Sequence, residues 1–194
     1  MAFVLTLRDT DDLYKKSANQ NIKKTDLRDC LNALGYNLAQ QTKQVFEISK
    51  LKYDNVLCVV ILRGGAFLYP GFLTHFTGSN FCMVGISRDP EAGTPQCDYM
   101  TSIDADQYDC VVYLDCVVAS GSTILKAHEK LSSICKFGDK VAAVICSSTD
   151  GTQKLTEAGF SMLGYSLSEH NENGVVAPDF GRMDAGEVFY KSSE

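Results

Sequence analysis

Four runs of apolar residues restrict the folds open to this chain more than any other feature of its sequence. They occupy residues 56–62, 81–86, 110–114 and 141–146, and the first reads Val-Leu-Cys-Val-Val-Ile-Leu without a polar residue. A strand with one face in water alternates apolar and polar residues, whereas a continuous apolar run is typical of a strand buried on both faces. We therefore predict a mostly parallel central sheet that is covered by helices.

Helix-sized segments separate these predicted strands, at residues 66–77, 122–136 and 152–158. A longer helix is predicted before the first strand, from about residue 26 to residue 49, because its apolar residues recur at near-helical spacing. Thr25 is the expected N-cap of that helix. The alternation of strand and helix predicts an α/β fold with a mostly parallel central sheet, flanking helices and right-handed crossovers.

One segment, residues 88–107, does not fit this alternation. It is polar, contains Pro90, Gly93 and Pro95, and is too long for a simple connection. We expect it to form a flap or hood over a site, or an excursion of short strands. A length of 194 residues with 45% hydrophobic content suits one domain with a single core, so residues 1–194 are expected to form a single domain.

The composition excludes several classes of protein. A net charge of −6, a pI near 5.1 and scattered basic residues argue against nucleic-acid binding. The sequence contains no apolar stretch long enough to span a membrane, and its first residues do not resemble a signal peptide. Most of the eight cysteines lie in or beside apolar runs, without a C-x-x-C pair. We interpret them as buried thiols of a cytoplasmic protein rather than as zinc ligands or disulfides.

The segment after the third apolar run carries the strongest indication of chemistry. The strand is expected to present Asp115 at its tip, a loop of small residues follows, and a helix is expected to begin at Ser122 or Thr123. Backbone amides that converge in such a loop, together with a helix N-terminus, bind phosphate. The carboxylate of Asp115 is suited to accept hydrogen bonds from ribose hydroxyls. The phosphate loop of nucleoside triphosphatases, G-x-x-x-x-G-K-[ST], is absent, which disfavours that class.

Arginines follow the first two predicted strands. Arg63 precedes Gly64 and Gly65, and Arg88 opens the long polar segment. A guanidinium group can hold phosphate oxygens with charge-assisted hydrogen bonds, each worth roughly 1.5–3 kcal/mol. Ligands of open α/β sheets bind beyond the carboxyl ends of the strands. Arg63, Arg88, Asp115 and the loop after it therefore predict a site for a phosphorylated sugar that bears a second, polyphosphate group.

These segments resemble the motifs of the uracil phosphoribosyltransferase family. The family's D-P-x-x-A-T-G-G-S is similar to D-C-V-V-A-S-G-S-T at residues 115–123, and its P-I-L-R-A-G is similar to V-I-L-R-G-G at residues 60–65. Its V-G-M-x-R-x-E-x-x-x-P resembles residues 84–95, and its C-terminal I-I-P-G-L-G-D-A-G-D resembles residues 176–187. The motifs occur in the same order, and the resemblance is collinear from about residue 8 to residue 190.

The resemblance implies a phosphoribosyltransferase fold and a substrate, 5-phosphoribosyl 1-pyrophosphate (PRPP). Arg63, Asp115 and Arg88 would act in catalysis. The residues implied in PRPP binding are Arg63, Gly64, Gly65, Arg88, Asp115, Cys116, Val117, Val118, Ala119, Ser120, Gly121, Ser122, Thr123 and Asp184. Mg²⁺ would bridge the pyrophosphate and the ribose hydroxyls, and no protein side chain is expected as a metal ligand. The resemblance also implies a homodimer or a higher homo-oligomer and raises GTP binding as an expectation.

The base would be recognised by a C-terminal loop at about residues 168–187. In the resemblance, uracil would be lined by Val176, Met183, Asp184 and Ala185, largely through backbone groups. This part of the chain departs from the family pattern, because it holds two extra residues and places Met183 where the family has glycine. A side chain at that position is expected to narrow or reshape the pocket.

Two other functions are weighed against uracil phosphoribosyl transfer. A purine phosphoribosyltransferase usually carries two adjacent acids at its PRPP loop, whereas here Leu114 precedes the single Asp115. That difference favours uracil as the base and UMP as the product. The second alternative is a regulator that binds PRPP or UMP without turnover, which the altered C-terminal loop leaves open.

Overall fold

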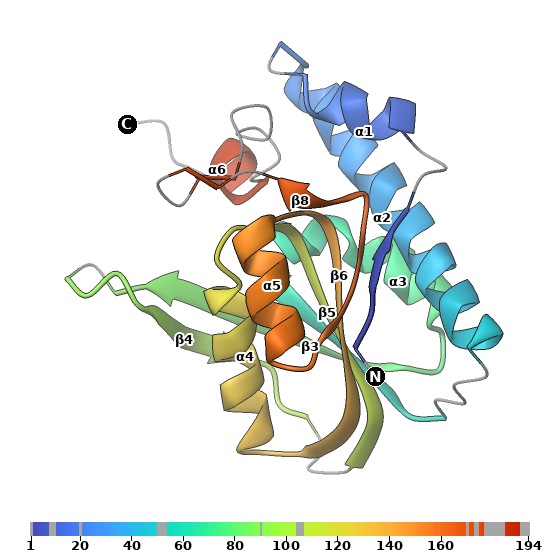
Figure 1. Ribbon diagram of the computed structural model, residues 1–194, viewed down its shortest axis with the longest axis vertical. Helices are drawn as coiled ribbons and strands as arrows, with labels where there is room; N and C mark the ends of the chain where they lie inside the picture. The colour runs from blue at the N-terminus through green and yellow to red at the C-terminus, as the bar shows by residue number, and fades with distance from the viewer. Residues whose placement is uncertain are drawn as a thin grey trace.

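The computed structural model is an α/β structure built around one large sheet (Figure 1). It describes residues 2–7, 11–19, 21–49, 54–89, 91–103, 107–169, 171–172, 175–176 and 185–190. The elements in chain order are β1 (Val4–Thr6), α1 (Asp11–Ser17), α2 (Lys24–Ile48), β2 (Val56–Leu62), the 3-10 helix η1 (Gly64–Phe67), α3 (Tyr69–His75), β3 (Asn80–Arg88), β4 (Pro95–Met100), β5 (Gln107–Val118), α4 (Ser122–Ser132), β6 (Lys136–Ser148), α5 (Thr149–Glu157), β7 (Ser161–Gly164), β8 (Ser166–Glu169), β9 (Asn171–Glu172), β10 (Val175–Val176) and α6 (Ala185–Tyr190).

The large sheet has the strand order β1-β7-β6-β5-β2-β3-β4, with β8 also paired to β6. Its pairs are parallel, except that β4 runs antiparallel to β3. All four predicted strands are confirmed as β2, β3, β5 and β6, which form its centre. The mostly parallel sheet expected from the sequence is thereby confirmed.

Both faces of the central strands are buried, as the continuous apolar runs predict. Alternate residues of β5 belong to two separate clusters: Leu114 packs with α2 residues such as Leu34, and Tyr113 packs with α4 residues such as Ile124. Helices α2 and α3 lie on one side of the sheet, and α4 and α5 lie on the other (Figure 1). Because helices cover both faces of the sheet, a ligand site is expected at the edge where the parallel strands end.

Several element boundaries differ from the sequence-based expectations. Helix α2 begins one residue before Thr25, so Thr25 is not its N-cap; that position belongs to Lys23, which makes no side-chain capping bond. The segment predicted as one helix at 66–77 is divided into η1 and α3, and Pro70 lies in the first turn of α3. Proline is tolerated there because a first-turn amide has no partner within the helix.

The polar segment after β3 forms a β-hairpin, which was one of its two expected forms. Strands β3 and β4 pair antiparallel, Arg88 stands opposite Pro95, and Gly93 in the turn has a φ of 65°. The Asp89 carboxylate accepts hydrogen bonds from the turn amides of Glu91 and Ala92 at 2.9 and 2.7 Å. This hairpin extends away from the body of the sheet (Figure 1); its role as a cover for a ligand stays a prediction.

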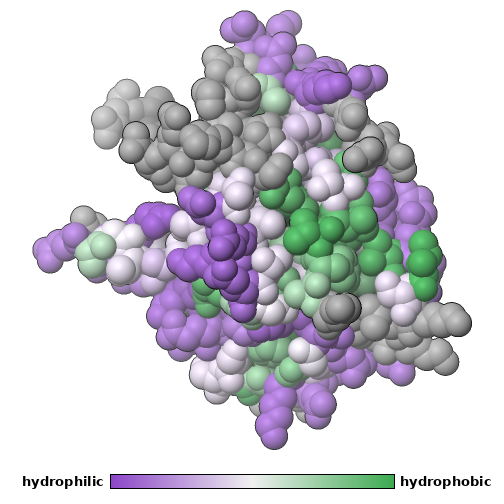
Figure 2. Space-filling model, viewed as in Figure 1, coloured by the Kyte–Doolittle hydropathy of each residue, from purple (hydrophilic) through white to green (hydrophobic). Residues whose placement is uncertain are grey.

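Strand β1 lies at the other edge of the sheet and was not predicted. Among the described strands it pairs only with β7, and Val4 and Leu5 expose 50% and 38% of their surface. Figure 2 shows that hydrophobic side chains gather on the surface over this strand. None of the helices in the described part of the chain is long and apolar enough to cross a membrane.

Candidate functional site

The strand order places a topological switch point between β2 and β5, where open α/β sheets have a ligand-binding crevice. These strands are neighbours, yet the chain after β2 continues to β3 on one side, while the chain after β5 continues to β6 on the other. Connections that leave in opposite directions part the two loops and open a crevice beyond the carboxyl ends of the strands, where open α/β sheets bind ligands. Two segments predicted from the sequence, Arg63–Gly65 and the loop after Asp115, border this crevice.

Backbone packing brings these two segments into contact. A Cβ atom on Gly64 would lie 2.5 Å from Oδ1 of Asp115, and one on Gly65 would overlap the carbonyl oxygen of Leu114. The Cys116 thiol donates to the carbonyl of Gly64 at 3.1 Å. Only glycine permits so close an approach of η1 to β5. The peptide bond between Leu62 and Arg63, where the chain enters η1, is cis.

The strand that carries Asp115 is longer than the sequence suggests. Asp115 was expected at its tip, but β5 continues to Val118, and Asp115, Val117 and Val118 pair with β6. The reason is that β6 reaches Ser148 and offers a partner beyond Asp115, so the apolar residues 116–118 extend the sheet. Asp115 therefore lies inside the strand, partly exposed, and the loop itself is reduced to residues 119–121.

The loop at 119–121 has backbone donors available for a ligand. Gly121 adopts the left-handed conformation with φ 72° and is the N-cap of α4, which begins at Ser122 as predicted. No described residue accepts a hydrogen bond from the amide of Ser120 or of Gly121. The hydroxyls of Ser120 and Ser122 lie 2.8 Å apart. This phosphate loop, as we call residues 119–123, thus combines open amides, hydroxyls and a helix N-terminus, the groups that bind phosphate.

The two predicted arginines lie at different levels of the crevice. Arg63 is exposed and is the N-cap residue of η1, next to the glycines that touch β5. Arg88 is also exposed and ends β3, where its Nη1 donates to the carbonyl of Gly93 at 3.1 Å. Since Leu62 pairs with Gly85, Arg88 lies three residues beyond the last paired level of β2, roughly 10 Å along an extended strand. Arg63 thus lies directly after β2, and Arg88 lies farther out, on the hairpin.

A C-terminal contact that the sequence analysis missed brings helix α6 to η1. The rings of Phe189 and Phe67 lie 5.1 Å apart with an interplanar angle of 42°, and Ala185, the first residue of α6, is fully buried. The sequence signal that could have predicted this contact was an aromatic residue within a short apolar stretch near residue 189. Ala185 therefore belongs to the same buried cluster as Phe67 of η1.

Part of the predicted base loop lies outside the described residues. Met183 and Asp184 are not described, and for Val176 only the backbone is described, as the last residue of β10. The hairpin of β9 and β10 precedes these residues and α6 follows them. Base recognition by Val176, Met183, Asp184 and Ala185 remains a prediction.

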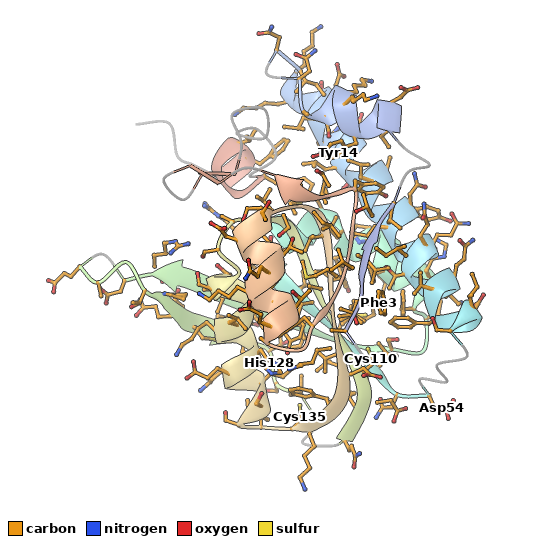
Figure 3. The ribbon with its side chains drawn as sticks, in the orientation of Figure 1. Phe3, Tyr14, Asp54, Cys110, His128 and Cys135 are labelled. Carbon is orange, nitrogen blue, oxygen red and sulfur yellow. The ribbon has the colours of Figure 1, made fainter. Side chains whose placement is uncertain are left out.

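His128 is a half-buried member of an aromatic cluster rather than a surface group. Its Nδ1 lies 2.9 Å from the Tyr113 hydroxyl, and its ring packs against Phe137 and Phe160. Burial, and to a lesser degree the charge of Lys140, lowers the pKa of His128 to about 4. Figure 3 places His128 and Cys135 together at the end of the molecule opposite α6. This cluster is therefore separate from the crevice.

The cysteines and acids of the described residues do not form a metal centre. All eight cysteines are free, and seven of them are buried. Burial raises the pKa of Cys58 and Cys110 and keeps both thiols protonated. Within the described ranges, no three His, Cys, Asp or Glu side chains are grouped so that they could hold a metal ion.

The sequence and the fold of this chain are similar to those of known proteins. The family model described as uracil phosphoribosyltransferase matches residues 20–191. A uracil phosphoribosyltransferase of Agathobacter rectalis is 30% identical over 149 residues, which cover 74% of this chain and 68% of that protein. Among solved structures, the AQ2163 protein of Aquifex aeolicus has a TM-score of 0.81 at 18% identity and covers 97% of this chain and 98% of its own.

A second solved structure has a similar fold at lower similarity. It is the adenine phosphoribosyltransferase of Trypanosoma brucei, in complex with AMP, pyrophosphate and ribose-5-phosphate. Its TM-score is 0.56 at 14% identity, with coverage of 92% of this chain and 87% of that one. At this identity the likeness concerns the fold alone, and it confirms the expected fold type.

Proposed function

Because the chain belongs to the uracil phosphoribosyltransferase family and is thus a phosphoribosyltransferase, we propose that it transfers the phosphoribosyl group of PRPP to uracil, giving UMP and pyrophosphate. The observation that carries the proposal is the junction of η1 and β5. Gly64 lies against the Asp115 carboxylate there, within a crevice that also contains a loop with open amides. Such a crevice is suited to a ligand with two phosphate groups on one sugar.

In this proposal, the phosphate loop and Asp115 hold the ribose 5-phosphate part of PRPP. The amides of Ser120 and Gly121 and the hydroxyls of Ser122 and Thr123 donate to the 5-phosphate, where the N-terminus of α4 adds partial positive charge. The last residues of β5, 116–118, and Ala119 precede these donors and line the remainder of the phosphate subsite. Asp115 accepts hydrogen bonds from the ribose hydroxyls, so its position beside Gly64 orients the anomeric carbon toward η1.

The pyrophosphate would lie over η1, with Arg63 at the floor and Arg88 above it. A ring nitrogen of uracil forms a bond to the anomeric carbon and loses its proton to solvent, while the bond to pyrophosphate breaks and negative charge grows on the leaving group. The arginines stabilise this charge by positioning and electrostatics, without a protein nucleophile. Mg²⁺, held by PRPP oxygens and water as that ion prefers, would supply further charge neutralisation when bound. Arg88 would first exchange its bond to the Gly93 carbonyl for a phosphate oxygen.

Uracil would bind beside η1, at the segment that includes Val176, Met183, Asp184 and Ala185. The support for this placement is the packing of α6 on η1 through Phe189 and Phe67, which keeps Ala185 close to the crevice. The β3–β4 hairpin would cover PRPP and exclude water, which competes with the base as nucleophile.

The environment of Leu114 argues against the purine alternative. This side chain is fully buried, and its carbonyl lies against Gly65. A second acid at this position would be buried in an apolar cluster at considerable cost. The single acid therefore suits this fold and favours the pyrimidine base.

A base panel tests the proposal most directly. The protein is incubated with PRPP, Mg²⁺ and labelled uracil, hypoxanthine or guanine, and nucleotide products are separated. We expect UMP alone. A product from a purine but not from uracil would assign the enzyme to purines, and tight PRPP or UMP binding without product from any base would indicate a regulator. The same assay with and without GTP tests nucleotide regulation.

We also propose that the enzyme works in the cytoplasm as a homodimer or a higher homo-oligomer, as the family resemblance implies. The free thiols of all eight cysteines are compatible with a reducing compartment. Sedimentation equilibrium at several concentrations measures the assembly, and a single species at the mass of one chain would contradict it.

A further inference from the structure

A buried hydroxyl behind the phosphate loop links the loop to helix α5. Ser148 is fully buried and is the N-cap of α5, where its Oγ accepts a hydrogen bond from the Gly151 amide at 2.9 Å. The same hydroxyl donates to the carbonyl oxygen of Ala119. We propose that Ser148 is a positioning residue that aims the Ser120 amide at the 5-phosphate of PRPP. The inference rests on the proposed function.

The first turn of α5 lies in close contact with the end of β5 and the start of the loop. A Cβ atom on Gly151 would lie 2.5 Å from the Ala119 carbonyl oxygen and 2.9 Å from Cγ1 of Val118. The first turn of α5 therefore presses against the end of β5, and the Ala119 carbonyl points into that contact. Ser148 fixes this carbonyl because its hydroxyl is held in turn by the Gly151 amide.

The direction of one carbonyl determines the direction of the next amide. In a trans peptide unit, the C=O of one residue and the N–H of the following residue point in opposite directions. With the carbonyl of Ala119 bonded toward α5, the amide of Ser120 points away from α5. No described residue accepts a hydrogen bond from that amide. The serine hydroxyl thus sets the orientation of an open donor without touching the ligand itself.

A donor that is already oriented binds phosphate without an ordering cost. If the carbonyl of Ala119 loses its partner, the peptide unit between Ala119 and Ser120 can rotate, and the amide no longer points at one place. The effect is confined to binding of the 5-phosphate. Affinity for PRPP should fall, whereas binding of the base to the PRPP complex should change little.

The test is Ser148→Ala in the full-length protein, with PRPP affinity measured by calorimetry and steady-state kinetics measured for both substrates. We expect the dissociation constant for PRPP to rise about tenfold. This change corresponds to a loss of about 1.4 kcal/mol of binding free energy, the contribution of one hydrogen bond. The KM for the base at saturating PRPP should stay within twofold. Ser148→Gly is the second variant, because glycine keeps most of an N-cap's stability without the hydroxyl.

Thr152→Val is the matched control. Thr152 is a buried residue of the same helix, and its hydroxyl donates to the carbonyl of Leu167 at 2.8 Å rather than to the loop. This variant should lose stability comparably but keep PRPP affinity within twofold. Unchanged PRPP affinity in the folded Ser148 variants, or an equal loss in Thr152→Val, would overturn the inference. If the unmodified protein does not bind PRPP, the proposed function fails instead.

Discussion

The phosphate loop and the aromatic cluster around His128 both include residues next to or within β5 and α4, but their polar groups differ in pairing. In the loop, the amides of Ser120 and Gly121 have no partner among the described residues. In the cluster, the buried Tyr113 hydroxyl is paired with His128 at 2.9 Å. Unpaired donors cost stability unless water or a ligand satisfies them. Under the proposed function, β5 therefore serves binding at its carboxyl end, whereas the side that faces α4 serves stability.

Among the variants that test this comparison, Asp115→Asn is expected to have the largest effect on PRPP affinity. The amide can still accept the hydrogen bond that the Cys116 amide now makes at 2.8 Å, but it loses the charge that, in the proposed function, holds the ribose hydroxyls. PRPP affinity should fall by about a hundredfold or more, because charge-assisted hydrogen bonds contribute about 1.5–3 kcal/mol each. Calorimetry measures the affinity, and circular dichroism checks the fold. Unchanged affinity in a folded variant would remove Asp115 from the site.

The second-largest loss of PRPP affinity is expected from Arg63→Ala. Arg63 is exposed, so truncation should leave the free energy of unfolding within about 0.5 kcal/mol. Affinity for PRPP should fall roughly tenfold to a hundredfold, since one charge-assisted contact to the pyrophosphate is lost. Ribose 5-phosphate, which lacks the pyrophosphate, is the matched ligand and should bind both proteins equally. An equal loss for both ligands would contradict the assignment of Arg63 to the pyrophosphate.

Tyr113→Phe tests the other half of the comparison. It removes the hydroxyl that pairs with His128 but keeps the ring, which lies 5.5 Å from that of Phe160. We expect the free energy of unfolding, measured in urea, to fall by about 1–2 kcal/mol. The kinetic constants at saturating substrates should stay within twofold. A large change in PRPP affinity would show that the two regions are not independent.

The smallest effect is a dependence of stability on pH. The pKa of His128 is lowered by burial and by Lys140 to about 4 in the folded protein, below its ordinary value of 6.5. Between these two values the unfolded chain binds more protons, so stability is full above about pH 6.5 and is lost as the pH falls toward 4. Because the ring is only partly buried, the loss should be on the order of 1 kcal/mol.

Urea midpoints at pH 7 and pH 4.5 measure this loss, and His128→Gln is the control. The glutamine variant does not titrate at this position, so its midpoint should fall less between the two pH values. An equal fall in both proteins would assign the pH dependence to other groups.

Local sequence was sufficient to predict the centre of the fold. The run at residues 56–62 coincides with β2, and α4 begins at Ser122 as predicted. These features depend on neighbouring residues: continuous apolar character for a doubly covered strand, and small residues before a helix. The N-cap at Thr25 was wrong, because α2 begins at Lys24 and its N-cap, Lys23, makes no side-chain capping bond.

Other features depend on contacts between distant segments and could not be predicted. The extension of β5 to Val118 requires the length of β6, and the approach of Gly64 to Asp115 requires β2 and β5 to be neighbours. The sequence also contains no sign that Ser148 would reach the carbonyl of Ala119 across 29 residues.

The amino-acid sequence by itself determined the α/β class, the family and the residue types of the proposed sugar-phosphate site, because periodicity and short motifs are local properties. The tertiary structure decided which backbones touch at that site, how far Arg88 lies from its floor, and which loop amides are open. Strand order and register set these relations, and they arise only when segments far apart in the chain pack together.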